Sequence, residues 1–195
     1  MALVLRNGVE IVDPEPIVAG YLEAWRFEAG DRSATFAEAD LRLANRGGAR
    51  ISAAEIAAIL ERRRAVEQAL RAIPPQASLA ARSVPWLPLR QLFDAFAGLR
   101  GVGFSKTTKT LHPKRPALVP MLDSVVQRYL QDDDLGAGAP FGERALALVR
   151  GYKRDLDRNG EALRAVRRAL AKRGHDVGEV RILDLLIWSV EADAR

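Results

Sequence analysis

The strongest indication of the fold is the segment Leu99-Arg100-Gly101-Val102-Gly103-Phe104-Ser105-Lys106-Thr107-Thr108-Lys109-Thr110-Leu111. Gly101 and Gly103 permit the positive φ that a tight turn needs. Val102 is placed to anchor the turn in the core, and Leu99 and Leu111 are placed to close the packing on either side. The stretch therefore predicts a helix, a tight turn, and a second helix over residues 104–111.

The start of that second helix is a candidate phosphate site. Its first backbone amides have no partner inside the helix, and the positive end of the helix dipole favours an anion there. The candidate phosphate-binding residues are Gly101, Val102, Gly103, Ser105, Lys106 and Lys109. Two alternatives compete. One is a plain turn between helices; the other is a dinucleotide-binding fingerprint, which would need a preceding strand and a third glycine.

Helical patterns extend outward from this stretch in both directions. Before it we expect helices over about 15–28, from Phe36 to the Gly47-Gly48 pair, and over 52–73, where Ser52 and Glu55 form a capping box. Around it and after it we expect helices over about 89–99, 121–131, 141–157, 160–173 and 178–192. The Asn7-Gly8 pair is typical of two-residue hairpin turns and allows a short β-hairpin within residues 2–12.

These elements predict an all-α fold, a two-lobed helical bundle that contains a helix-hairpin-helix motif. We expect one helical domain over residues 1–195. It consists of an amino-terminal helical segment (1–75), a connecting loop (76–88), the hairpin region (89–131) and C-terminal helices (140–195).

Composition excludes several kinds of site. The chain has 195 residues and no cysteine, which excludes disulfides, thiolate zinc sites and a cysteine nucleophile. With His112 and His175 as its only histidines, we expect no metal site and no cofactor. Acid–base chemistry would have to rest on carboxylates.

Charge favours an acidic partner. The net charge is +5 and the sequence pI is near 10.0. The chain has five lysines and 25 arginines. The high share of arginine suits bidentate contact with phosphate, but it also fits the coding bias of a GC-rich genome. The amino terminus lacks the apolar core of a signal peptide, and no run reaches the roughly 18 apolar residues of a membrane span. We therefore expect a cytoplasmic protein without a membrane partner.

A second motif follows the hairpin, in the run Lys114-Arg115-Pro116-Ala117-Leu118-Val119-Pro120-Met121-Leu122-Asp123-Ser124-Val125-Val126-Gln127-Arg128. With Asp123 lying 18 residues after Ser105, the run resembles the helix-hairpin-helix DNA glycosylase superfamily, in which an Asp-x-x-Val-x-Arg pattern opens the next helix. The chain also looks similar to a family of bacterial proteins of unknown function that share the core Lys-Arg-Pro-x-Leu-x-Pro-x-x-Asp.

The glycosylase resemblance implies a site. Ser105 stands in the slot where strand-cleaving members carry a lysine, which implies an enzyme that only removes the base. Asp123 would stabilise the sugar cation or activate water once the base is flipped out. Lys114, Arg115 and Arg128 would contact the nucleic acid, and duplex DNA is the implied partner. The chain departs from the family at Arg100, where proline is usual, and at Thr107-Thr108-Lys109, where small residues are usual.

Each of these residues also has a structural interpretation. Asp123 and Ser105 both suit helix caps, and Lys114 and Arg115 also fit ordinary loop charges. Three tryptophans, Trp25, Trp86 and Trp188, could line a base pocket or simply pack in the core. Two functions remain open: a nucleic-acid-binding protein acting as a monofunctional glycosylase, or a non-catalytic DNA-binding or interaction protein on the same scaffold.

Overall fold

The structure is a computed structural model that describes residues 2–24 and 30–192. Most of these residues are helical, and the predicted hairpin is present as a two-stranded antiparallel sheet that pairs Leu3 with Ile11. The elements are β1 (Leu3–Val4), β2 (Glu10–Ile11), α1 (Pro14–Ala24), α2 (Glu38–Arg46), α3 (Ala53–Glu61), α4 (Arg63–Arg71), α5 (Trp86–Asp94), α6 (Phe104–Leu111), α7 (Ser124–Tyr129), the 3₁₀ helix η1 (Gln131–Asp133), α8 (Phe141–Arg158), α9 (Gly160–Lys172) and α10 (Glu179–Ala192).

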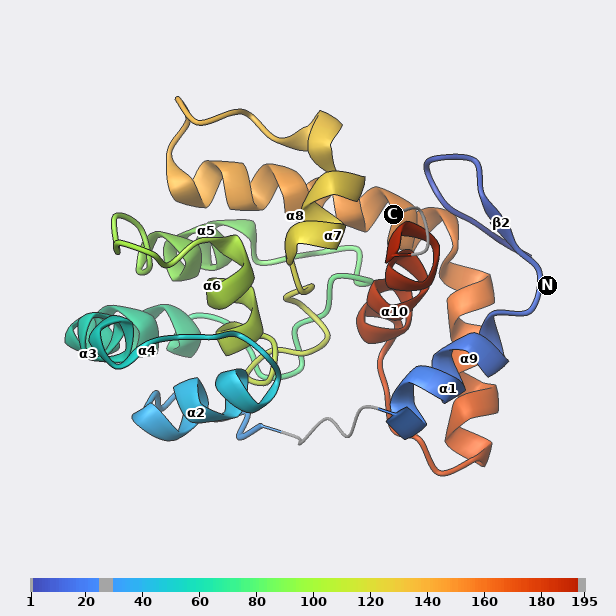
Figure 1. Ribbon diagram of the computed structural model, residues 1–195, viewed down its shortest axis with the longest axis horizontal. Coiled ribbons are helices and arrows are strands. Elements are labelled where there is room, and N and C mark those ends of the chain that lie inside the picture. Colours follow the sequence, from blue (N-terminus) through green and yellow to red (C-terminus); the bar gives the residue numbers. More distant parts are fainter. Residues whose placement is uncertain (1, 25–29, 193–195) are drawn as a thin grey trace.

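The helices gather at two sides of the molecule. Helices α2 to α6 lie together on one side, and the hairpin with α1, α9 and α10 lies on the other (Figure 1). The long helix α8 runs along both groups, packing most extensively against α5, while α10 packs against α7, α9 and α1. One continuous hydrophobic core, from Leu3 to Ile187, joins the two groups.

Several element boundaries differ from the sequence prediction. The helix expected over 52–73 is two helices, α3 and α4, which meet at Arg62 (φ −90°, ψ 3°). The Arg62 amide donates to Ile59, three residues back, so the last turn of α3 tightens into 3₁₀ geometry. Helix α5 begins at Trp86, inside the expected loop, and ends at Asp94. The part of the first predicted helix that falls on residues 25–28 lies outside the described residues.

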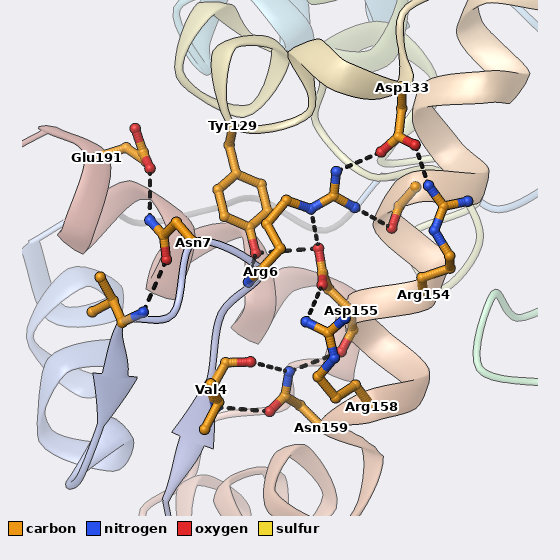
Figure 2. Close-up of polar contacts among 12 residues, drawn as sticks. Val4, Arg6, Asn7, Tyr129, Asp133, Arg154, Asp155, Arg158, Asn159 and Glu191 are labelled. Atoms are coloured by element: carbon orange, nitrogen blue, oxygen red, sulfur yellow. Dashed lines mark hydrogen bonds and ion pairs between the residues drawn. The ribbon is translucent and has the colours of Figure 1, made fainter.

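The N-terminal hairpin is tied to α8 through Arg6. Its guanidinium donates to Asp155 (2.7 Å), to Asp133 and to the Gly151 carbonyl (2.7 Å), and it lies over the Tyr129 ring (Figure 2). Asp155 is buried, so this arginine supplies a positive charge to a carboxylate removed from water.

Candidate nucleic-acid interface

The connection between α5 and α6 occupies residues 95–103 and contains two glycine turns. Gly98 (φ +73°) and Gly101 (φ +79°) are left-handed, and the Val102 amide donates to the Leu99 carbonyl (3.1 Å). Val102 is buried, as predicted. Gly103 has φ −94° and needs no glycine, so only one glycine of the predicted pair provides a positive φ.

Helix α6 begins at the predicted residue, Phe104, and no side chain in the part of the chain that the structure describes caps the amides of its first turn. Gly103 is the N-cap, and no described side chain bonds to the cap, which leaves the amides of Phe104, Ser105 and Lys106 without helical partners. Gly101 and Gly103 are exposed. Ser105 is the second residue of the helix, and its prediction as the cap is wrong because Gly103 takes that position. We call residues 99–106 the bend.

The two lysines expected to assist phosphate binding both have partners. Lys106 Nζ donates to both carboxylate oxygens of Glu55, at 2.6 and 2.7 Å. This bond lowers the pKa of Glu55. Lys109 donates to the Gly48 carbonyl at 3.3 Å. Nothing in the sequence pairs position 55 with position 106, so sequence reasoning missed Glu55 as a member of the site.

A short loop joins α2 to α3 and contacts α6 through Lys109. Asn45 holds it by accepting from the Ile51 amide (2.6 Å) and donating to the Ile51 carbonyl (2.8 Å). Arg50 is exposed there with a left-handed backbone (φ +56°), which is strained for a residue other than glycine. A hollow of about 410 Å³ next to the loop is lined by Arg42, Asn45, Arg46 and Ile56.

This side of the molecule carries the positive charge of the chain. Residues 31–115, which include α2 to α6, contain 15 basic and 7 acidic residues, whereas the remaining residues contain 15 basic and 18 acidic ones. A segment with such an excess attracts an anionic polymer. The moderate net charge of the whole chain therefore conceals a polarised distribution.

Lys114 was predicted to contact nucleic acid, and the structure corrects this. Its side chain is 2% exposed and forms ion pairs with Asp40 (2.9 Å) and Asp31 (3.5 Å). Asp40 also accepts from the Ala37 amide at the start of α2. Lys114 therefore ties the segment after α6 to the N-terminus of α2.

Arg115 is corrected in the same way. It is 1% exposed, and its guanidinium donates to the backbone carbonyls of Leu70 (2.9 Å), Ile73 (3.0 Å) and Arg32 (2.7 Å). The first two carbonyls lie in the last turn of α4 and just after it, where a cation also complements the helix dipole. The residue caps α4 from inside the molecule and cannot reach a ligand at the surface.

Asp123 caps α7, which confirms its structural interpretation. Oδ1 accepts from the amides of Val125 (3.0 Å) and Val126 (3.1 Å), and Oδ2 accepts from Trp188 Nε1 on α10 (2.7 Å). None of these donors belongs to α6. The chain next to Asp123 does contact α6, because the Leu122 amide donates to Thr108 Oγ1 (3.0 Å). Asp123 as a whole is partly exposed.

Behind Asp123 lies a second carboxylate that the sequence did not single out. Asp184 on α10 is buried, and its Oδ2 accepts from the Met121 amide (3.3 Å). Burial raises the pKa of Asp184 to about 7, although the positive charge of nearby Arg181 acts to lower it. The spacing of Asp184 and Trp188 places both on one face of α10, where they hold the segment that leads to Asp123.

The other predicted residues lie apart from the bend. Arg128 is exposed in the last turn of α7. Trp86 is half-buried with Arg150 stacked over its ring at 5.2 Å, and Trp25 lies outside the described residues. Within residues 2–24 and 30–192, no group of acidic or histidine side chains could hold a metal ion, and no helix is long and apolar enough to cross a bilayer.

Comparisons with known proteins show a family. Neither the curated proteins nor the solved structures contain a match to the chain. A match to a protein family, DUF6308, covers residues 19–191, which include every helix from α2 to α9 and all the candidate residues above. The chain therefore belongs to DUF6308, a family of unknown function.

Proposed function

We propose that the protein binds the sugar–phosphate backbone of a nucleic acid, with duplex DNA as the expected form, through the bend before α6. The observation that carries this proposal is the bend, exposed at Arg100, Gly101 and Gly103, with uncapped amides at the start of α6. It lies in the segment that holds the excess of basic residues. Amides at a helix N-terminus bind phosphate without reading sequence. The proposal therefore predicts binding that depends on salt more than on sequence.

Arg100 offers the direct test because it is exposed within the bend. The wild-type protein should bind a short duplex with an affinity that falls as salt rises, and Arg100→Gln should reduce the log–log slope by about 0.9, the value for one lost phosphate contact. Fluorescence anisotropy over a salt series measures the affinity of each protein and the log–log slope. Arg168→Gln, an exposed arginine on α9, is the matched control and should leave the slope unchanged. A wild-type affinity that does not respond to salt would rule the proposal out.

A second candidate is monofunctional removal of a base by Asp123. It is favoured by the partial exposure of Asp123, whose carboxylate Trp188 and the α7 amides hold in one orientation. An ionised carboxylate held in this way could stabilise a sugar cation once a flipped base leaves. The resemblance to glycosylases supports this candidate and stays a prediction, since no comparison tests it.

The Asp123→Asn variant separates the two candidates. Asparagine is as good an N-cap as aspartate, so the start of α7 should be preserved. With duplexes that carry damaged or mismatched bases, an enzyme would form abasic sites, and the variant would lose this product while it still binds. If the wild-type protein forms no product across the panel, the catalytic candidate is wrong and non-catalytic binding remains.

A further inference from the structure

Glu55 lies against the bend and neutralises its nearest cation. Both of its carboxylate oxygens accept from Lys106 Nζ, and Oε2 also accepts from the Ser52 amide at 2.8 Å. A Cβ built on Gly101 would come within 2.2 Å of Glu55 Oε1, so the carboxylate is seated directly on the turn. The Glu55 and Lys106 side chains are only 14% and 23% exposed, which weakens screening of their pairing by solvent.

This arrangement conflicts with a phosphate at the same place. A phosphate on the amides of Ser105 and Lys106 would bring a second negative charge close to the Glu55 carboxylate. Two negative charges that are close together and partly buried repel each other more strongly than two charges in open solvent, because water screens them less. Lys106 Nζ has three N–H donors and already contacts both Glu55 oxygens, so few of its donors are left for a phosphate. A phosphate at the bend is therefore bound more tightly when Glu55 gives up Lys106.

Other acidic side chains of residues 31–115 are engaged away from α6. Asp31 and Asp40 pair with Lys114, Glu38 with Arg42, Glu67 with Arg63, and Asp94 with Arg90. Glu61 is exposed at the far end of α3. Glu55 is thus the carboxylate of this segment that contacts the bend.

We propose that Glu55 sets the affinity of the bend for phosphate. In the free protein it occupies Lys106, and a backbone phosphate takes Lys106 from it on binding. This inference rests on the proposed function, since it concerns the same bend. It identifies Glu55 as the residue that restricts binding to ligands able to compete with a carboxylate.

The Glu55→Gln variant removes the charge and keeps the fold. Glutamine can also accept from the Ser52 amide, so the capping box that starts α3 is retained. At about 0.1 M salt we expect the variant to bind the duplex about tenfold more tightly, with a log–log slope steeper by about 0.9 because Lys106 becomes available. Glu61→Gln, which removes one charge from the other end of the same helix, should change affinity less than about twofold. Adding Lys106→Gln to Glu55→Gln should abolish the gain.

Inorganic phosphate provides a second readout without nucleic acid. In a titration followed by NMR, the amide signals of Gly103, Ser105 and Lys106 should move at lower phosphate concentration in Glu55→Gln than in the wild type. The signals of α9 should not move in either protein.

The outcomes distinguish this inference from the proposed function. If the wild type binds duplex and Glu55→Gln binds no more tightly than Glu61→Gln, the inference is wrong and the proposed function stands. If neither protein binds duplex and phosphate leaves the bend amides unmoved in both, both are wrong. Binding by Glu55→Gln alone, lost again with Lys106→Gln, would support the inference.

Discussion

Gly101 and Gly103 differ in what their backbones require, although the sequence presents them as a pair. Gly101 is left-handed, and any side chain there would meet the Glu55 carboxylate, whereas Gly103 is in an extended conformation with open space around its Cα. Gly101→Ala should therefore destabilise the protein by about 1–2 kcal/mol from backbone conformation alone. Gly103→Ala should change the free energy of unfolding by less than about 0.5 kcal/mol. Urea denaturation of the two variants measures the difference, and equal losses would contradict the assignment.

Some contacts of single residues can be predicted from the sequence, and others cannot. The sequence predicts that Asp123 caps a helix, because an aspartate just before a helical pattern can accept hydrogen bonds from the first amides of the helix. Its bond to Trp188 could not be foreseen, since it joins residues 65 positions apart and depends on how α10 packs. Glu55 shows the same limit: its capping box is a local pattern, but its contact with Lys106 exists only after α3 and α6 are brought together.

At the scale of elements, local signals located the helices well. Helix α6 has the predicted bounds, and α8, α9 and α10 differ by a residue or so from the expected ones, because their apolar periodicity is long and their ends carry Pro, Asn or Gly. The division of α3 from α4 was missed. Apolar residues continue through Arg62 at helical spacing, so periodicity carries no sign of the tightened turn.

The Lys114-Arg115 pair is buried for a reason that its local sequence does not carry. Two cations beside a proline resemble a solvated loop, and a buried charge is rare unless it is paired. Here α2 supplies Asp40 for one cation and the end of α4 supplies carbonyls for the other. Both partners come from elements far away in sequence, so the pair acts as a junction between elements. The positive charge available to a ligand lies instead on Arg50, Arg100 and their neighbours.

Across the whole molecule, two sets of long-range contacts hold the helical groups together. Arg6 joins the N-terminal hairpin to α8 (Figure 2). Asp184 and Trp188 of α10 bond to the segment after α6. Two buried titratable groups lie near this second set: Asp184 of α10, and His112, which follows α6 and contacts the Val119 carbonyl through Nδ1 (2.7 Å). Both have Arg181 as a charged neighbour. Their protonation makes the stability of the fold depend on pH.

The two groups should act on stability in opposite directions. Burial lowers the pKa of His112 from 6.5 to about 4, so the folded protein binds fewer protons than the unfolded chain in this range and gains stability as pH rises. Burial raises the pKa of Asp184 from 3.8 to about 7, so the folded protein keeps a proton that the unfolded chain releases and loses stability as pH rises. The windows overlap, and in the wild type the two effects offset each other.

Single substitutions should therefore tilt the pH profile of the whole molecule in opposite ways. Between about pH 4 and 7, Asp184→Asn should become more stable relative to the wild type as pH rises, and His112→Asn should become less stable. Chemical denaturation at a series of pH values gives the free energy of unfolding for each protein, with Glu161→Gln on the exposed face of α9 as the reference for a surface carboxylate. Taking each difference against the wild type removes the contribution of all other carboxylates. Two variants whose stability changes in the same direction would show that these groups are not buried as the structure places them.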